Sequence, residues 1–274
     1  MLPKRKTAGI SRLSLVGELR RAIVHDHLSL VYQPKVDLRA SRITGVEALA
    51  RWRHLELGWI PPTEFIPLAE ETGFIMPLSL WVINSALRQC EAWSREDLIM
   101  SVAVNLSTLN LQATEFPEQV KGLIASYRVP QTQLGFEITE TAIMTDPERA
   151  IAALTQMKDM GLKLSIDDFG TGHSSLAYLG TLPVHELKID KSFIKKMTTH
   201  KNHKFIVQSI IDLAHRLGLG VVAEGVETQS EKDLLVELQC DEAQGFYFAQ
   251  PLPPTELNVW LSEQPRARGE ALKG

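Results

Sequence analysis

Short runs of aliphatic and β-branched residues alternate with longer amphipathic segments along most of the chain. This alternation is typical of repeated strand–helix units around a parallel sheet. The pattern predicts eight strands, at residues 28–36, 43–50, 101–106, 134–139, 163–167, 186–189, 220–223 and 243–247. Although 274 residues also suit two domains, α/β barrels of this size form one, and eight strands favour a single closed barrel.

The first two predicted strands are joined by residues 37–42, which leave no room for a crossover helix. They must form a hairpin, because parallel neighbours need a connection of about a dozen residues or more. One strand of the barrel is therefore predicted to run antiparallel to the others.

Helical periodicity predicts long helices later in the chain, at 69–93 with a break near 73–77, at 147–160 and at 201–217. Gly161 and Gly218 follow the last two segments. Glycine suits the left-handed conformation that ends many helices, so both positions are predicted C-terminal caps.

An amphipathic helix is also predicted near the start, where Leu13, Val16, Leu19 and Ile23 recur at helical spacing. This helix either packs onto the barrel or continues from an upstream domain. The predicted organisation is a linker or upstream tail at 1–14, a barrel at 15–262 and a flexible C-terminal tail at 263–274.

The composition is that of an ordinary soluble globular protein, with 44% hydrophobic residues, 23% charged residues and a net charge of -4. This charge argues against nucleic acid polymers as partners. Cys90 and Cys240 lie far apart without a C-x-x-C pattern, so neither a disulfide framework nor a zinc site is indicated, and a reducing cytoplasm fits. No apolar run approaches the roughly 20 residues of a membrane span, so this segment is not expected to insert into a membrane, although a longer parent chain could be tethered.

Most predicted strands end on a carboxylate, amide or amine that directly follows an apolar residue. These strand-end residues are Glu47, Asn105, Glu137, Asp167 with Asp168, Lys188, Glu224 and Gln244. Because the C-terminal ends of barrel strands converge on one rim, these side chains are expected to share one pocket. Each alone is more often a solvated or salt-bridged side chain, but their repetition from strand to strand favours a site.

The predicted rim gathers several carboxylates, and buried charges of one sign require a cation among them. Lys188 supplies only one positive charge. An oxygen-dominated set without Cys or His matches Mg²⁺ or Mn²⁺ better than zinc, and the adjacent Asp167 and Asp168 indicate two ions. A two-metal site suits in-line displacement at phosphorus, so the pattern favours phosphodiester hydrolysis. The alternative is an enolate-forming barrel enzyme, which also uses rim carboxylates, Mg²⁺ and a Lys base.

A glycine-rich segment, D-D-F-G-T-G-H-S-S at 167–175, begins at the two adjacent candidate ligands. Gly170 and Gly172 favour a mobile active-site lid, and the G-K-[ST] element of a Walker loop is absent. The alternatives are an ordinary turn at the glycines, a helix cap at Asp167 and Asp168, and a simple core ion pair at Lys188.

Eight short motifs occur in order along the chain. They are Y-Q-P at 32–34, E-A-L-A-R-W at 47–52, N-L-S at 105–107, E-I-T-E at 137–140, D-D-F-G-T-G-H-S-S at 167–175, L-K-I-D at 187–190, A-E-G-V-E at 223–227 and Q-G-F-Y-F at 244–248. In these motifs the chain resembles the EAL-domain family of cyclic di-GMP phosphodiesterases, over about residues 15–262. The resemblance implies a modified TIM (β/α)8 barrel with one antiparallel strand, in agreement with the predicted hairpin.

The resemblance also implies a role for each site residue. One metal ion would be bound by Glu47, Asn105, Glu137 and Asp167, and the second by Asp167, Asp168 and Glu224. Lys188 would hold or polarise the attacking water, Glu224 is the other candidate for the general base, and Glu140 would anchor the lid. The residues expected along the dinucleotide are Gln33, Leu49, Arg51, Asp190, Glu227 and Gln244, among which Arg51 suits a phosphate oxygen.

The implied reaction opens cyclic di-GMP to linear pGpG and requires Mg²⁺ or Mn²⁺. A second hypothesis is a sensor module that binds cyclic di-GMP with little turnover until an attached upstream regulatory domain acts. Two positions depart from the family pattern and bear on lid dynamics and dimer-linked regulation: His173 stands where the lid more often has Tyr, and His185 where Asp is common. The resemblance further implies a homodimer that pairs through the lid loop and the following helix.

Overall fold

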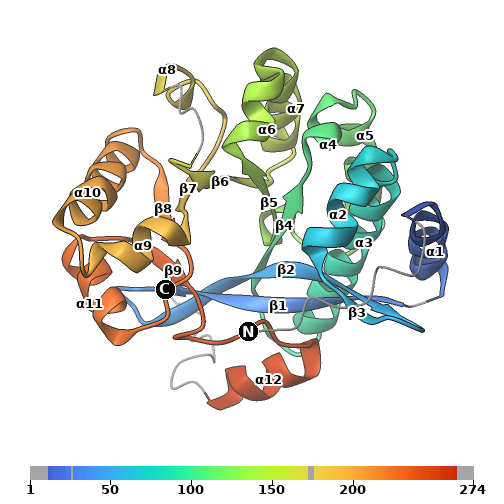
Figure 1. Ribbon diagram of the computed structural model, residues 1–274, viewed down its shortest axis with the longest axis horizontal. Helices are drawn as coiled ribbons and strands as arrows, with labels where there is room; N and C mark the ends of the chain where they lie inside the picture. The colour runs from blue at the N-terminus through green and yellow to red at the C-terminus, as the bar shows by residue number, and fades with distance from the viewer. Residues whose placement is uncertain (1–11, 26, 172–175, 264–274) are drawn as a thin grey trace.

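A closed barrel of eight strands forms the centre of the computed structural model, which describes residues 12–25, 27–171 and 176–263 (Figure 1). The strands are β1 (Leu28–Asp37), β2 (Arg42–His54), β3 (Gly58–Ile60), β4 (Ser101–Leu106), β5 (Leu134–Thr139), β6 (Lys163–Phe169), β7 (Glu186–Ile189), β8 (Gly220–Ala223) and β9 (Glu242–Gln244). Strand β2 and strands β4 to β9 pair in parallel in chain order, and β1 closes the ring antiparallel to both β9 and β2. Strand β3 pairs with β2 outside the ring. The predicted α/β barrel with one antiparallel strand is confirmed.

Strand bounds follow the sequence pattern closely where the strands are apolar. The bounds of β4, β5, β7 and β8 are those predicted. The prediction missed β3 and the end of β2, because residues 51–60 mix charged and aromatic side chains without regular alternation. Strand β9 is shorter than predicted because the chain turns at Gly245, where an added Cβ would lie 2.2 Å from the Val226 carbonyl oxygen.

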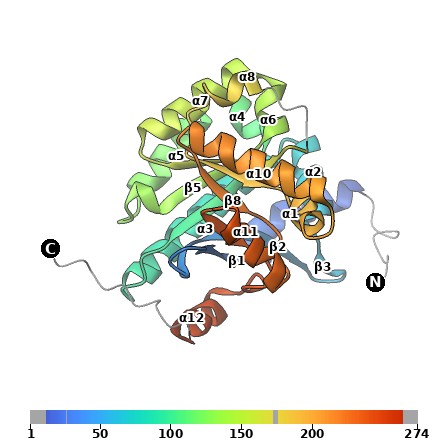
Figure 2. The same cartoon turned by 90° about the vertical axis from the view of Figure 1, so that its left-hand side faces the viewer.

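The helices cover the outside of the barrel (Figures 1 and 2). They are α1 (Arg12–Val24), α2 (Pro62–Glu71), α3 (Ile75–Ser94), α4 (Thr108–Gln112), α5 (Phe116–Ala125), α6 (Glu140–Thr145), α7 (Pro147–Asp159), α8 (Leu176–Leu179), α9 (Lys191–Met197), α10 (Lys201–Arg216), α11 (Gln229–Glu237) and α12 (Pro254–Glu263), with a short 3-10 turn at Gln131–Gln133. Helix α12 lies against β1, on the outer side of the hairpin (Figure 1). Within the described residues, none of the helices combines the length and apolar character needed to cross a membrane.

Glycines mark the helix ends that the sequence indicated. The predicted break separates α2 from α3, where Gly73 has φ of 69°. Gly161 and Gly218 have φ of 85° and 73° directly beyond the ends of α7 and α10, which confirms the predicted caps.

The first helix packs onto the barrel assembly, which is one of the two roles predicted for it. Leu15, Leu19 and Ala22 are buried, and the Glu18 carboxylate contacts the His54 ring at the end of β2. Helix α1 lies beside α2 (Figure 1). The predicted tails at 1–14 and 263–274 lie mostly outside the described residues, so the domain boundaries remain predictions.

Alternation along the barrel strands separates an apolar face from a polar one. On β5 and β7 the side chains of Leu134, Phe136 and Leu187 are fully buried. Because successive side chains of a strand point to opposite faces, the intervening Glu137 and Lys188 point the other way, into the barrel. The apolar layer between strands and helices is therefore the hydrophobic core, and the barrel interior is left for charged groups.

Both cysteines should resist thiol reagents in the native protein. Cys90 and Cys240 are unpaired and buried, and burial raises the pKa of each thiol to about 12. At neutral pH the thiolate population is then about a thousandfold below that of an ordinary cysteine, and the thiolate is the reactive form. We expect labelling by a chromogenic disulfide reagent only after guanidinium unfolding, with two thiols then released per chain. Rapid labelling of the folded protein would contradict this burial.

Candidate active site

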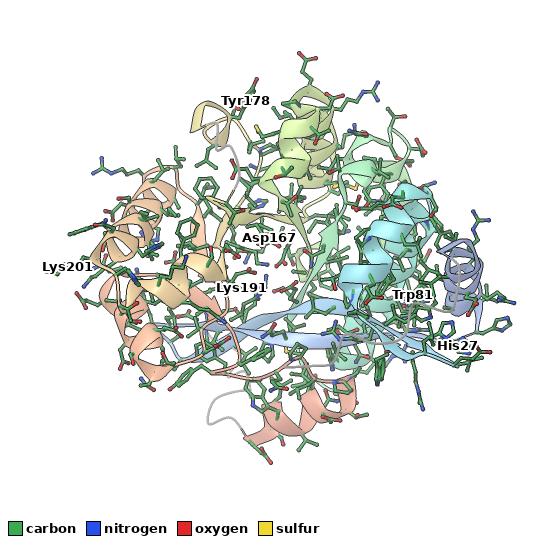
Figure 3. The ribbon with its side chains drawn as sticks, in the orientation of Figure 1. His27, Trp81, Asp167, Tyr178, Lys191 and Lys201 are labelled. Carbon is green, nitrogen blue, oxygen red and sulfur yellow. The ribbon has the colours of Figure 1, made fainter. Side chains whose placement is uncertain are left out.

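The side chain of Lys188 lies at the centre of the polar interior and has no exposed surface. Its Nζ is 2.5 Å from Glu137 Oε2, 2.6 Å from Glu224 Oε1, 3.1 Å from Asp167 Oδ1 and 3.8 Å from Glu47 Oε2. The carboxylates belong to β2, β5 and β6 and to the residue after β8. Asp167 lies near the middle of the ring in Figure 3. The structure thus brings together strand-end residues that are distant in sequence.

A bulge in β6 lets two adjacent carboxylates serve the same site. Between the pairs Ile166↔Leu187 and Phe169↔Ile189 the register shifts, so Asp167 and Asp168 lie opposite Lys188 alone. Asp168 has φ of 52°, a left-handed conformation that Asp tolerates better than most residues. In a regular strand the two side chains would point to opposite faces. Here oxygens of Asp167, Asp168 and Glu224 all lie within 4.8 Å of one another.

Two amides complete the ring around Glu47. Asn105 Nδ2 donates to Glu47 Oε1 at 2.7 Å, and Gln244 Nε2 donates to Glu47 Oε2 at 2.7 Å and to Glu224 Oε1 at 2.9 Å. Gln244 Oε1 is buried and has no hydrogen-bond partner among the described residues. Because an unpaired buried acceptor costs about 1–3 kcal/mol, this oxygen indicates that the site is built to receive a further group.

The cluster carries more negative charge than its amines balance. Burial raises the pKa of Glu224 to about 8 against the opposing effect of Lys188, and burial together with Glu137 raises the pKa of Glu47. Burial alone would also raise the pKa of Glu137, but the adjacent Lys188 and Lys35 lower it to about 2. The raised pKa values of Glu224 and Glu47 indicate that the cluster favours additional positive charge, which a proton or a cation can supply.

The donor chemistry fits hard divalent cations. The side chains that meet in the cluster are carboxylates and amides, whose oxygens can serve as ligands, and the described site contains neither a thiolate nor an imidazole. Mg²⁺ and Mn²⁺ prefer such ligands, whereas structural zinc sites use Cys and His. The three-carboxylate group formed by Asp167, Asp168 and Glu224 is the part of the cluster best placed to hold an ion.

The beginning of the glycine-rich loop is tied to the neighbouring helix. Glu140, the first residue of α6, is buried, and its Oε2 accepts a hydrogen bond from Gly170 N at 3.4 Å. Gly170 has φ of 91°, and an added Cβ would lie 3.1 Å from the Phe193 ring. The predicted lid residues Gly172 and His173 lie outside the described residues.

The residues predicted along the dinucleotide lie on and around the same rim. Leu49 and Arg51 follow Glu47 at alternate positions of β2, so all three share a face, and Gln33 lies directly opposite Glu47 on β1. Asp190 caps α9 by accepting from Ser192 N at 2.9 Å, and exposed Glu227 pairs with Lys195 at 2.7 Å. Asp190 and Glu227 therefore already have protein partners.

Two residues, His185 and Lys35, have contacts that the sequence did not predict. His185 precedes β7, at the end opposite the acidic cluster, and its Nδ1 accepts from Leu164 N at 3.1 Å. Its observed contact therefore joins the beginning of β7 to β6, away from the acidic cluster. The sequence reasoning missed Lys35, whose Nζ lies 2.5 Å from Glu137 Oε1. The only signal was its position two residues after Gln33, on the same face of β1.

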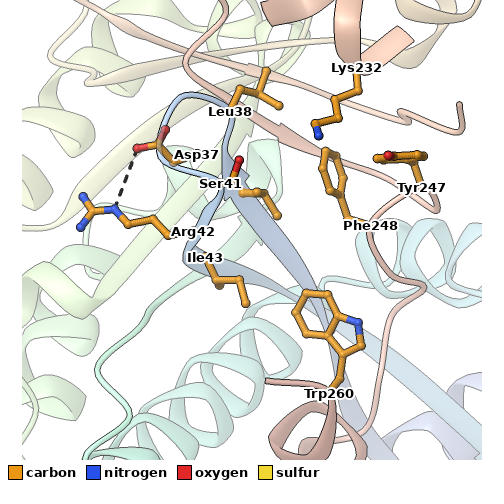
Figure 4. A pocket seen from close by; sticks show the side chains of 10 residues that line it. Asp37, Leu38, Ser41, Arg42, Ile43, Lys232, Tyr247, Phe248 and Trp260 are labelled. Atoms are coloured by element: carbon orange, nitrogen blue, oxygen red, sulfur yellow. Dashed lines mark ion pairs between the residues drawn. The ribbon is translucent and has the colours of Figure 1, made fainter. Parts of the chain in front are cut away.

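A separate cavity of about 250 Å³ lies on the outside of the barrel (Figure 4). It is bordered by the turn of the β1–β2 hairpin, Lys232 of α11, the aromatic pair Tyr247 and Phe248, and Trp260 of α12. None of the predicted metal or substrate residues lines it. The chemistry of the acidic cluster does not extend to this cavity.

The fold and the cluster together define a barrel protein with an acidic, cation-binding type of site at the C-terminal ends of its strands. A family model described as the EAL domain matches residues 16–251, and the chain belongs to the EAL domain family. The signaling protein YkoW of Bacillus subtilis is 41% identical over 247 residues, which are 90% of this chain and 31% of that protein. A protein named cyclic di-GMP phosphodiesterase from Pseudomonas aeruginosa is 39% identical over 249 residues, 90% of this chain and 42% of that protein.

A solved structure supports the same relationship. The PaMucR phosphodiesterase in complex with c-di-GMP matches with a TM-score of 0.85 and 40% identity, covering 89% of this chain and 99% of that chain. The curated relatives are longer, and this chain spans roughly a third to two fifths of their length. Family membership is therefore established, and the activity of the whole protein is a matter for proposal.

Proposed function

We propose that this chain hydrolyses cyclic di-GMP to linear pGpG with two divalent cations, Mg²⁺ or Mn²⁺. The observation that carries the proposal is the complete set of rim carboxylates around buried Lys188. The named activity of the relatives and the c-di-GMP complex of a structural neighbour support the choice of substrate. An enolate-forming reaction would use similar residues, but family membership favours phosphodiester chemistry.

The ligands proposed for the ions are oxygen donors from the strand ends. One ion would be held by Glu47, Asn105, Glu137 and Asp167, and the second by Asp167, Asp168 and Glu224. When bound, such ions neutralise phosphate oxygens and make a water molecule acidic enough to attack phosphorus. The orphaned Gln244 Oε1 and the raised pKa values of Glu224 and Glu47 are consistent with a site made for positive charge, and bound ions would keep the Glu224 carboxylate ionised.

The surroundings of Lys188 and Glu224 favour different tasks in the reaction. Contacts with Glu137 and Glu224 outweigh burial and hold the pKa of Lys188 well above its ordinary value, so its amine stays protonated and donates hydrogen bonds. A protonated amine orients and polarises the attacking water but cannot take its proton. We assign proton acceptance to Glu224, whose carboxyl group lies 2.6 Å from Lys188 Nζ. The water oxygen would bond to phosphorus as a phosphorus–ribose oxygen bond breaks, and the leaving ribose oxygen would take up a proton to become the hydroxyl group of linear pGpG.

The remaining predicted residues would bind or enclose the substrate. Gln33, Leu49, Arg51 and Gln244 belong to the neighbouring strands β1, β2 and β9, and Asp190 and Glu227 follow β7 and β8. Arg51 extends from β2, and its Nη1 donates to the adjacent Ala50 carbonyl at 2.9 Å. A substrate phosphate would offer that guanidinium a charged acceptor instead. Glu140, through Gly170, would keep the lid loop attached to α6.

The decisive experiment is incubation of the purified chain with cyclic di-GMP and Mg²⁺ or Mn²⁺, followed by chromatography of the nucleotides. We expect pGpG to accumulate in a metal-dependent manner and its formation to stop when a chelator is added. Tight calorimetric binding of cyclic di-GMP without turnover in either metal would show a sensor module instead. Absence of both binding and turnover would reject both functions.

Three broader features complete the proposal. The chain would act as a homodimer, as the family resemblance implies, and an upstream regulatory domain would belong to a longer chain. The greater length of the curated relatives supports the second feature. The proposed site of action is the cytoplasm, in keeping with the two unpaired cysteines.

A further inference from the structure

Lys35 is a second buried amine inside the barrel, and it comes from the antiparallel strand. It is 5% exposed and lies on β1, where its backbone is opposite Gly45 of β2 and Gln244 of β9. Its side chain crosses the interior to Glu137 on β5, which is 102 positions away in sequence. The reversed strand thus brings a cation to the acidic cluster from outside the set of parallel strand ends.

Each carboxylate oxygen of Glu137 has its own amine. Lys35 Nζ lies 2.5 Å from Oε1, and Lys188 Nζ lies 2.5 Å from Oε2. The Glu137 side chain has no exposed surface, so no water competes for either oxygen from the bulk. Two charge-assisted hydrogen bonds to opposite oxygens fix the plane and the direction of this carboxylate.

The two amines differ in how firmly they depend on Glu137. Lys188 also lies within 4.0 Å of Glu224, Asp167 and Glu47, so it keeps anionic partners if it leaves Glu137. Among the ion pairs of the described residues, Lys35 has Glu137 alone. The amine at Oε1, Lys35, therefore has no other ion-pair partner among the described residues, whereas the amine at Oε2, Lys188, is shared with three further carboxylates.

We propose that Lys35 is a positioning residue that holds Oε1 of Glu137 and so leaves Oε2 as the oxygen offered to a divalent cation. This inference rests on the proposed function, because it takes Glu137 as a metal ligand. Lys35 itself touches neither ion nor substrate in this scheme. Its effect passes entirely through the Glu137 carboxylate.

Without Lys35, the Glu137 carboxylate is free to rotate or to move fully onto Lys188. Hydrogen-bond partners that orient metal ligands typically contribute 10–100-fold to metal affinity. We expect Lys35→Met, which keeps the apolar stem and removes the amine, to weaken Mn²⁺ binding by about 10–100-fold. Calorimetric titration of the metal-free protein with Mn²⁺ measures this directly, without reference to turnover.

A double-mutant cycle tests the route of the effect. Mn²⁺ is titrated into wild type, Lys35→Met, Glu137→Gln and the double variant. If Lys35 acts through Glu137, the double variant should match Glu137→Gln in Mn²⁺ affinity. The control is Lys204→Met, which removes an amine paired with Glu237 between helices α10 and α11 and should bind Mn²⁺ like wild type.

Several results would overturn the inference. Unchanged Mn²⁺ affinity in Lys35→Met would leave Lys35 a purely structural ion-pair partner, and tighter binding would mean that it only repels the cation. Further weakening of Glu137→Gln by Lys35→Met would place its action elsewhere. If Lys35→Met fails to fold, the Mn²⁺ affinity of Lys35→Gln is compared with that of wild type. The double variant, which lacks both charges, is still compared with Glu137→Gln. Failure of wild type to bind Mn²⁺ would reject the proposed metal site itself, a result distinct from equal binding by wild type and variant.

Discussion

Replacing Lys188 by methionine should strongly slow hydrolysis of cyclic di-GMP and destabilise the metal-free protein. The substitution leaves Glu137, Glu224, Asp167 and Glu47 without their shared amine in a buried site. Breaking a buried ion pair by removing one partner typically costs about 3–5 kcal/mol, so a comparable fall in the free energy of unfolding is expected. The loss of water orientation should lower kcat by at least about 100-fold.

Adding a metal ion distinguishes the loss of stability in Lys188→Met from its loss of turnover. A divalent cation supplies positive charge to the carboxylates that Lys188 no longer balances, so Mn²⁺ should raise the Tm of Lys188→Met more than that of wild type. Urea unfolding with and without Mn²⁺ gives the stability, and pGpG release gives the rate. Lys196→Met, on the exposed side of α9, is the control and should behave like wild type. Retained turnover in Lys188→Met would remove this lysine from the proposed reaction.

Exchanging Asp167 for asparagine should remove the carboxylate proposed to serve both ions. Asparagine keeps the shape and can still accept the hydrogen bond that Asp168 N donates to Oδ1 at 3.0 Å. The loss is therefore one of charge and not of fold. Since partners of metal ligands already contribute 10–100-fold, we expect more than about 100-fold weaker Mn²⁺ binding and a similar fall in turnover.

The control for this exchange is Asp159→Asn, at the exposed end of α7. Both variants should unfold within about 1 kcal/mol of each other if Asp167 has no structural role beyond its charge. Mn²⁺ titration and pGpG release are measured on each. Wild-type metal affinity in Asp167→Asn would contradict the assignment of this residue to both ions.

The sequence predicted the fold well because apolar strands and amphipathic helices leave a local pattern. The hairpin followed from a connection too short for a helix, and β4, β5, β7 and β8 followed from short segments rich in aliphatic and β-branched residues. Strand β3 had no such segment. Its exposed Trp59 and Gly58 lie in a polar stretch where alternation is lost.

The site was predictable to the extent that it follows strand ends. Glu47, Glu137 and Lys188 meet in the structure because each occupies the inward face of a barrel strand. The shared orientation of Asp167 and Asp168 was not predictable from alternation, which places neighbours on opposite faces. It depends on a bulge and on the positive φ of Asp168, and neither leaves a distinct local signal.

The division of β5 and β7 into an apolar outer face and a charged inner face has a consequence for how substitutions act on this barrel. Phe136 and Leu187 are buried on one face, while Glu137 and Lys188, to which we assign roles in the proposed reaction, form an ion pair on the other. Isosteric exchanges on the inner face can therefore alter reactivity while the outer face still drives folding. Exchanges such as Asp167→Asn therefore probe the charged interior while the apolar layer that holds the barrel together stays intact.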